Sequence, residues 1–434
     1  MFSDISLIFS TAWKIIFGWG WIFIPFILWK PAFYLWLWWR RELFWGKQKS
    51  ILLEIKLPKE SLKPIRAMEQ VLAGLWQGFW DPPRPWEKLW DGKTSLGFQI
   101  EITSIEGITH FYIRCPDYRK DVVEANIYSQ YPEAEVSLAE DYTKNIPHNI
   151  PNKDWDVWGS DYCFIKPNPY PIKTYRQFET ESEKEEEKRV DPIASLFECL
   201  AKLKKGEQAW IQLQASSLAQ EAADPFLKQG EAIKDKLAKR TNEIKAQKPM
   251  AQEAAEILIT GRVPEEKKEE KFELIAPELR LTLGEREIIE EVEKKISKPV
   301  FECSMRFLFL GQRELWFKPN LRLFLAHFGN YVTQNLNSLV PLGRTISKVY
   351  SKPPLSILDE RRLYLRKRKI FRLYLDRFPP YFPLSATYNT GVFILNIEEL
   401  ASLFHFPSRR VAPAPGISRV EAKKGEAPSE LPVE

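Results

Sequence analysis

Gly92, Lys93 and Thr94 have the residue types that end a nucleotide-binding P-loop. The full pattern, GxxxxGK[ST], lets backbone N–H groups surround the phosphates while the lysine and the hydroxyl reach them. The first glycine of that pattern would fall at position 87, which is a glutamate, and its carboxylate would repel phosphate. The Pro- and Trp-rich run DPPRPWEKLW is also not a strand that leads into a helix. We therefore predict a surface turn here and no ATP hydrolysis.

A basic stretch is the sharpest chemical feature of the chain. Residues 358–380, LDERRLYLRKRKIFRLYLDRFPP, hold eight Lys or Arg between positions 361 and 377, interleaved with apolar residues. Such a helix face could meet phosphates, either of anionic lipid headgroups or of a nucleic-acid backbone. An amphipathic helix with a solvated basic face is an equally good interpretation. The residues that would contact phosphate are Arg361, Arg362, Arg366, Lys367, Arg368, Lys369 and Arg372.

The residue types that most often support catalysis are isolated in this sequence. None of the four histidines has a neighbouring Ser or Asp arrangement that suggests a triad. The pair Glu398-Glu399 lies where a helix begins, so a favourable interaction with the helix dipole explains it. Asp154 and Asp156 lie in a predicted loop, where capping or turn bonding is the simpler role. Because no nucleophile, base and oxyanion site come together, we predict that the protein is not an enzyme.

The cysteines argue against a metal centre. Cys115, Cys163, Cys199 and Cys303 are scattered singly, with no CxxC motif and no clustered histidine. This spacing disfavours a zinc site or a disulfide framework and favours free thiols in a reducing compartment. We predict neither a metal nor an organic cofactor.

The elements that position these residues begin with an apolar N-terminal segment. Residues 15–39, IIFGWGWIFIPFILWKPAFYLWLWW, contain a single charge, Lys30. Since a bilayer core needs about 20 apolar helical residues, we predict one tilted transmembrane span, or alternatively a helix that lies flat in the interface. Tryptophan favours the headgroup region of the membrane. The predicted anchoring residues are Trp19, Trp21, Trp29, Trp36, Trp38, Trp39, Arg40 and Arg41.

The charges on either side of this segment predict its orientation. Lys14 stands alone before it, whereas Arg40, Arg41, Lys47 and Lys49 follow it. By the positive-inside rule the N-terminus faces out, and the bulk of the chain lies on the cytoplasmic side of an inner membrane. Free cysteines agree with that compartment.

Residues 50–142 are predicted to form a ferredoxin-like domain of the α+β class. Apolar residues alternate in the strand segments and recur at helical spacing between them, which produces the order β-α-β-β-α-β. A sheet with two helices on one face is the expected result. The predicted elements are a strand at 51–58, a helix at 61–77, two strands within 95–116 joined at Glu106-Gly107, a helix at 117–132 and a strand at 133–142.

The rest of the chain is predicted to hold a second, diverged α+β domain. Residues 143–178 are rich in Pro, Asn, Asp and aromatic residues, which suggests an irregular segment, and ETESEKEEEKR after them is a solvated charge run. Strands at 209–216 and 300–311 alternate with charged helices. The predicted divisions are a membrane anchor (1–49), the ferredoxin-like domain (50–142), an irregular segment with an acidic linker (143–190), a second α+β domain (191–350) with a helical insertion (220–298), a basic helix with a closing strand and helix (351–407), and a disordered tail or linker (408–434).

Several stretches resemble one protein family. They are ILLEIKLPKESLKPIRAMEQVLAGLW, IEGITHFYIRCP, IYSQYPEAEVSLAEDYT, NIPNKDWDVWGSDY and VFILNIEELASLFHFPSRRVAPAP. Together they are similar to the membrane-anchored region that precedes the motor domain of bacterial type IV secretion and conjugative DNA-transfer ATPases, the coupling-protein and HerA/FtsK-like group. The resemblance covers most of residues 50–420, and LNIEELASLFHFP and YPEAEVSLAEDYT are its most specific parts. In that family a P-loop domain follows the segment that resembles KKGEAPSELPVE.

The resemblance implies a stand-alone accessory module of a secretion or conjugation machine at an inner membrane, since these 434 residues contain no P-loop. The implied partners are the membrane, a separately encoded P-loop motor ATPase, DNA or anionic lipid, and other copies of the chain. A membrane-tethered nucleic-acid-binding protein that uses the basic helix is the main alternative. An enzyme with an unfamiliar site is the third and weakest hypothesis.

Overall fold

One antiparallel sheet organises the protein. The computed structural model describes residues 18, 24–58, 63–178, 191–218, 220–237, 281–316, 318–351, 353, 355–378 and 390–407. Within them, nine strands pair in the order β4-β1-β3-β2-β6-β7-β5-β8, and β9 also pairs with β7. The strands are β1 (Ser50–Lys56), β2 (Phe98–Ile105), β3 (Ile108–Pro116), β4 (Glu135–Leu138), β5 (Trp155–Phe164), β6 (Glu207–Ser217), β7 (Val300–Gln312), β8 (Leu339–Pro341) and β9 (Phe393–Asn396).

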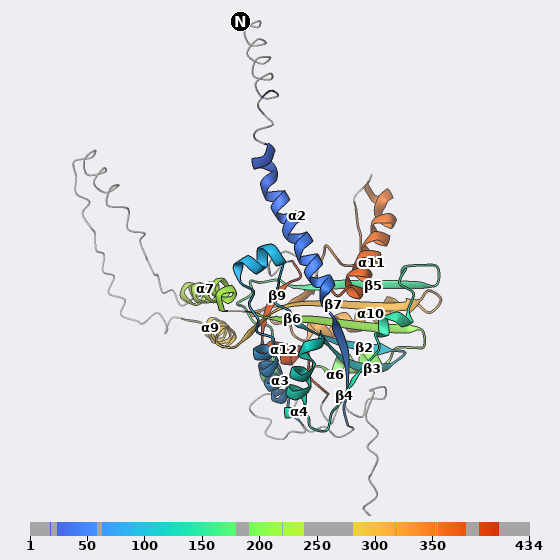
Figure 1. Ribbon diagram of the computed structural model, residues 1–434. Helices are drawn as coiled ribbons and strands as arrows, with labels where there is room; N and C mark the ends of the chain where they lie inside the picture. The colour runs from blue at the N-terminus through green and yellow to red at the C-terminus, as the bar shows by residue number, and fades with distance from the viewer. Residues whose placement is uncertain are drawn as a thin grey trace, which may run out of the picture.

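Helices cover both faces of this sheet, so the fold belongs to the α+β class. In Figure 1, α3, α4, α6 and α12 lie below the sheet, whereas α2 and α11 rise above it. The helices are α2 (Ile24–Lys47), α3 (Ile65–Gly78), α4 (Lys120–Gln130), α5 (Tyr175–Phe178), α6 (Ala194–Ala201), α7 (Gln220–Leu237), α9 (Leu283–Ile296), α10 (Lys318–Gly329), α11 (Asp359–Leu375) and α12 (Ile397–Leu403).

The central strands carry apolar side chains on both faces, because each face has its own core. Phe307 and Phe309 of β7 belong to the large core that also includes residues of α3, α6 and α12. Leu308 and Leu310, which alternate with them, belong to a second core with Phe371 of α11. Since successive strand side chains point to opposite faces, this alternation builds two cores from one strand.

The elements of residues 50–142 occur in the predicted order. β1, α3, β2, β3, α4 and β4 follow one another, and the hairpin between β2 and β3 turns at the predicted dipeptide. Glu106 has φ 54° and Gly107 has φ 89° there. Two left-handed residues in succession match the right-handed twist of the flanking strands.

The predicted irregular segment is wrong over residues 155–164. These residues form β5, which pairs with β7 over Trp155 to Asp161 and with β8 near its end. The strand was missed because Asp161, Gly159 and Ser160 are poor strand formers and no polar alternation marks a strand with two buried faces. Buried Asp161 is compensated by Arg306 of β7, whose Nε lies 2.7 Å from its Oδ1.

The two predicted α+β units share the sheet. β2 of the first unit pairs with β6 of the second over eight residues, from Phe98–Ala215 to Ile105–Gln208. The predicted helical insertion is represented by α7 and α9, while residues 238–280 lie outside the described residues. The predicted tail, 408–434, and the whole acidic run, 179–189, also lie outside them.

The predicted transmembrane span is not found among the described residues, where no helix combines enough length with enough apolar character to cross a membrane. α2 begins at Ile24 and continues through Arg40, Arg41 and Glu42 to Lys47, so its second half is charged. Residues 15–17 and 19–23 of the predicted span, with Trp19 and Trp21, lie outside the described residues.

Candidate functional site

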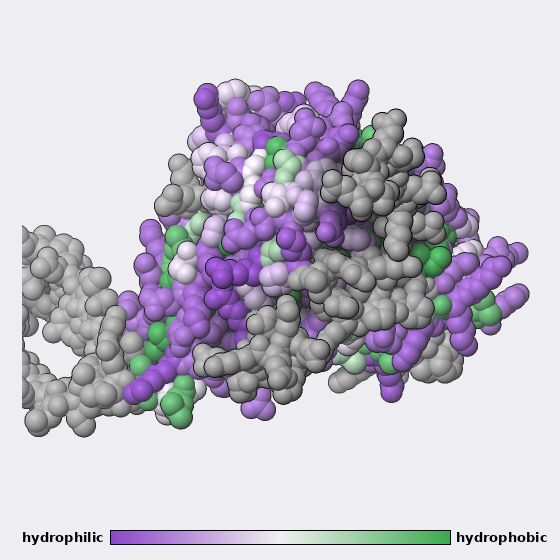
Figure 2. Space-filling view, turned by 90° about the horizontal axis from the view of Figure 1, so that it is seen from below, coloured by the Kyte–Doolittle hydropathy of each residue, from purple (hydrophilic) through white to green (hydrophobic). Residues whose placement is uncertain are grey.

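α2 carries a surface of exposed apolar side chains. It projects away from the sheet in Figure 1. The exposed fractions of Phe26, Trp29 and Leu35 are 76%, 71% and 66%, and Trp38 is also exposed. Seen from below, on the side away from α2, the described residues in view are mostly hydrophilic, with small separate apolar spots (Figure 2). Exposed apolar surface that is concentrated in this way marks an interaction site.

A segment after α3, residues 80–91, packs against the middle of α2. The Trp36 Nε1 donates a hydrogen bond to the carbonyl of Leu89 at 3.3 Å, and the rings of Trp36 and Trp90 meet edge to face with centroids 6.2 Å apart. Arg40 donates to the carbonyl of Trp90 and lies 4.0 Å from Asp91. Arg40, a predicted membrane-anchoring residue, therefore also ties this segment to α2.

Gly92, Lys93 and Thr94 follow this segment and belong to no helix or strand, but Gly92 is buried and the other two are half-buried, so the predicted surface position holds only in part. Gly92 has φ 66° and caps the short π-helix Glu87–Asp91. A Cβ on Gly92 would lie 2.3 Å from the carbonyl carbon of Arg40, so both its backbone conformation and its close approach to α2 require glycine. The Lys93 Nζ lies 3.4 Å from Asp81 and 3.6 Å from Glu87. This lysine therefore pairs with two carboxylates of the preceding segment.

α11 is the predicted basic helix, and its cations fall into two groups. Lys367 points at the body, with its Nζ 2.7 Å from Asp156 Oδ1, and Arg366 donates to the carbonyl of Lys348 at 2.8 Å. Arg362 donates to Ser351 Oγ at 2.9 Å. These three predicted phosphate contacts therefore already have partners within the protein.

The other basic residues of α11 face outward. Arg372 is paired with Asp376 at 3.4 Å, but its side chain remains 83% exposed. Arg361, Arg368 and Lys369 are exposed, and no ion pair involves them within the described ranges. Ile370, Phe371 and Tyr374 of the opposite face are buried. The structure therefore agrees with an amphipathic helix and leaves a narrower basic face than the sequence suggested.

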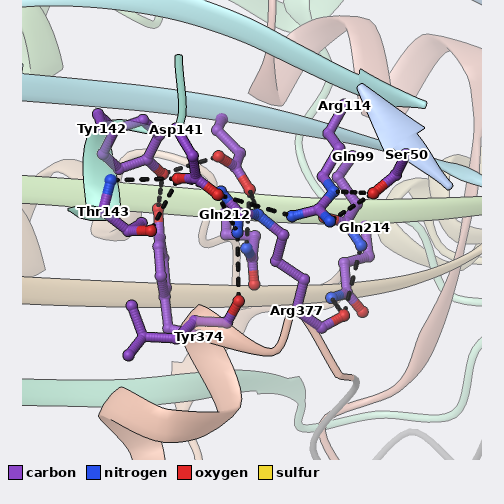
Figure 3. A network of polar contacts seen from close by, with 12 residues as sticks. Ser50, Gln99, Arg114, Asp141, Tyr142, Thr143, Gln212, Gln214, Tyr374 and Arg377 are labelled. Atoms are coloured by element: carbon purple, nitrogen blue, oxygen red, sulfur yellow. Dashed lines mark hydrogen bonds and ion pairs between the residues drawn. The ribbon is translucent and has the colours of Figure 1, made fainter. Parts of the chain in front are cut away.

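A buried polar network fixes the end of α11 to the sheet (Figure 3). Arg377, which has φ 55°, places its Nε 3.0 Å from Glu101 Oε1 and its Nη2 2.9 Å from Asp141 Oδ1. Its carbonyl accepts hydrogen bonds from the side-chain amides of Gln99 and Gln214. Through this network Arg377, which follows α11, is connected to strands β2 and β6 and to the segment after β4.

The same network satisfies the buried carboxylate of Glu101. Its oxygens accept hydrogen bonds from Tyr142 OH at 2.7 Å and Gln212 Nε2 at 2.9 Å, and Tyr142 OH lies 2.7 Å from Tyr374 OH. Burial acts to raise the pKa of Asp141, but hydrogen bonds from Arg377 and from Thr143 outweigh it and lower this pKa to about 2. Paired charges that are hydrogen-bonded on all sides favour a structural role.

Two of the histidines are brought close to Ser or Asp residues that sequence spacing did not indicate. Ser195 Oγ lies 2.7 Å from His327 Nδ1, although 132 residues separate them. Burial lowers the pKa of His327 to about 3, so its ring is neutral near pH 7. Asp191, however, bonds to Nε2 of His405 at 2.8 Å. Ser195 and Asp191 therefore bond to two different histidines.

The two carboxylate pairs also have structural partners. Glu399 forms a capping box with Asn396 at the start of α12, as its predicted dipole role requires, and its Oε2 lies 3.1 Å from Lys295 Nζ. Both charged groups are fully buried, which lowers the pKa of Lys295 and raises that of Glu399. Asp156 was predicted to have a turn role, but it mainly binds Lys367 of the basic helix.

Comparison with known proteins assigns no role to these residues. No protein-family model matches the sequence, and no curated protein matches it. In the part of the chain that the structure describes, no three His, Cys, Asp or Glu side chains are grouped as metal ligands. All four cysteines are free thiols there.

Proposed function

We propose that this chain is a non-catalytic scaffold that sits on the cytoplasmic side of a bacterial inner membrane. It would dock a separate P-loop motor ATPase of a type IV secretion or conjugative DNA-transfer machine, as the family resemblance implies. The observation that carries the membrane part is the exposed apolar surface of α2. Burying one such large side chain is worth about 1.5–3 kcal/mol, so several of them favour a lipid surface over water.

A ferredoxin-like arrangement of residues 50–142 forms part of this proposal. Its support is the strand order β4-β1-β3-β2 with antiparallel neighbours, together with the order of the elements along the chain. The two helices of this unit, α3 and α4, pack against one another. Such a unit supplies a rigid base from which α2 can project.

The C-terminal elements support the docking of a partner on the side away from α2. Phe404 and Phe406, which follow α12, are buried and pack edge to face against Phe111 of β3. The buried pair of Lys295 and Glu399 joins α9 to α12 in the same region. The chain that continues after Phe406 is therefore anchored in the large core, and α12 lies below the sheet in Figure 1, on the side away from α2.

Vesicle flotation tests the membrane part. Phe26, Trp29 and Leu35 are replaced together by Ser, and Leu138→Ser provides the control, because Leu138 is 63% exposed on the edge strand β4 and does not belong to α2. We expect the α2 variant to lose at least about tenfold of its binding to vesicles and the control to float like the wild type. Equal flotation of all three proteins would contradict the proposal.

Copurification tests the partner. Tagged protein extracted from membranes should bring down a P-loop ATPase. Repeated recovery of no P-loop ATPase would refute the docking role while leaving membrane binding intact.

A second candidate function is nucleic-acid binding by α11, which the exposed Arg361, Arg368 and Lys369 favour. Phosphate contacts release counterions, so each lost contact should lower the salt dependence of binding by about one unit of slope. The variant in which these three residues are Gln should lose binding to duplex DNA. Gln at Lys202, Lys204 and Lys205, an exposed trio after α6, is the matched control. Equal binding by both variants would exclude this role for α11.

A further inference from the structure

Residues 80–91 expose a cluster of large apolar side chains that no catalytic or docking role described above uses. The exposed fractions of Trp80, Trp86, Leu89 and Trp90 are 45%, 53%, 40% and 64%. The segment is nevertheless held firmly, because Trp36 and Arg40 of α2 bond to its backbone. Large aromatic side chains that are fixed by the backbone and still exposed indicate a contact surface.

The charges of this segment are unevenly satisfied. Its acidic groups have cationic partners: Lys93 lies close to Asp81 and Glu87, and Arg40 lies close to Asp91. Arg84 and Lys88 are different, since no ion pair involves their side chains within the described ranges. The outward chemistry is therefore aromatic and cationic. That combination is complementary to the headgroup region of a bilayer with anionic lipids.

The position of residues 80–91 along α2 matches the depth of the headgroup region. It contacts α2 between Trp36 and Arg40, where the helix changes from exposed apolar residues to basic ones. From Phe26 to Trp36 a helix rises about 15 Å, which is about half of a bilayer's hydrocarbon thickness. A helix inserted from its N-terminal end to Trp36 would therefore place the segment at the lipid–water boundary, where tryptophan is most stable.

We propose that residues 80–91 form an interfacial collar, which places Trp86, Leu89 and Trp90 among the headgroups of an anionic bilayer and limits how deeply α2 inserts. The inference rests on the proposed membrane function, and it adds a second membrane contact with a lipid preference. A bilayer is the occupant because the collar continues the apolar surface of α2 and because Arg84 and Lys88 complement anionic headgroups.

A site-specific fluorophore tests the collar. The label is attached to Trp86→Cys in a Cys199→Ser background, since the other three native cysteines are buried. The vesicles contain phosphatidylcholine with about 30 mol% phosphatidylglycerol. We expect binding to shift the emission to the blue and to reduce quenching by iodide at least about threefold. The same label at exposed Ser129→Cys on α4 should stay accessible to iodide.

The outcomes separate the two proposals. If the protein floats with the vesicles but the label at position 86 stays as accessible as in solution, the collar is refuted and the membrane function survives. If the wild-type protein does not float, both fail. Gln at Arg84 and Lys88 should lower binding to the anionic vesicles at least about fivefold more than Gln at Lys202 and Lys205. An equal effect of the two pairs would overturn the lipid preference.

Discussion

Arg377, the residue that ends the turn after α11, lies with its Nε 3.0 Å from the Oε1 of Glu101 in β2. The side chain of Arg377 is 4% exposed, and that of Glu101 is fully buried. The pair joins residues that are 276 positions apart, and it brings the basic helix onto the sheet in a fixed orientation. The position of the outward basic face of α11 therefore depends on a buried contact.

We expect Glu101→Gln to destabilise the fold strongly. Removal of one partner of a buried pair leaves an uncompensated charge, which costs about 3 kcal/mol of unfolding free energy. Urea unfolding in detergent measures this difference. Glu133→Gln, which changes an exposed glutamate between α4 and β4, should stay within about 0.5 kcal/mol of the wild type. Equal stability of the two variants would show that the network adds nothing.

The stabilising effect of Asp141 should depend on pH. Its pKa is lowered to about 2 in the folded protein, so the folded state binds fewer protons than the unfolded state below about pH 4. The stabilisation is therefore complete above about pH 4 and is lost as the pH falls toward 2. The stability difference between wild type and Asp141→Asn should shrink over this window.

The unfolding free energy, measured at several pH values, checks this dependence. Asp121→Asn alters an exposed carboxylate on α4 and should follow the wild-type curve throughout. A difference between wild type and Asp141→Asn that stayed constant from about pH 5 to 2 would contradict the assignment.

His327 should remain neutral well below pH 6. Burial lowers its pKa to about 3, whereas an unfolded histidine takes up its proton near 6.5. Protonation therefore favours the unfolded state as the pH falls between these values. Nitrogen chemical shifts of the histidine rings should show a neutral ring at position 327 at about pH 5. A ring that titrates near 6.5 would mean that His327 is accessible to water.

Gly92→Ala should release the segment of residues 80–91 from α2. The left-handed backbone and the contact with Arg40 both exclude a side chain, and together they should cost about 1–3 kcal/mol locally. Limited trypsin digestion should then cut faster after Lys88, whereas the bond after Arg84 precedes Pro85 and resists trypsin. Gly46→Ala, on α2 with no atom within 4 Å of the added carbon, is the control. Similar cleavage of both variants would argue against a tight contact at Gly92.

Elements with strong periodicity could be predicted from the sequence. The helix of the basic stretch, the strands β6 and β7 and the hairpin at Glu106 and Gly107 all lie close to their predicted positions. Each depends on side chains a few residues apart, and that spacing is visible in the chain. β5 could not be predicted, because its stability comes from pairing with β7 and from the match between Asp161 and Arg306, not from its own residues.

The candidate site was only partly predictable, for the same reason. The sequence by itself determined the apolar character of α2, the basic character of α11 and the absence of a glycine at position 87. The tertiary structure alone decided that Lys367 forms an ion pair with Asp156, that Gly92 packs against the backbone of Arg40, and that Ser195 is hydrogen-bonded to His327. Composition and period are local properties, whereas a charge is free or paired according to contacts across more than a hundred residues, which only the packed sheet creates.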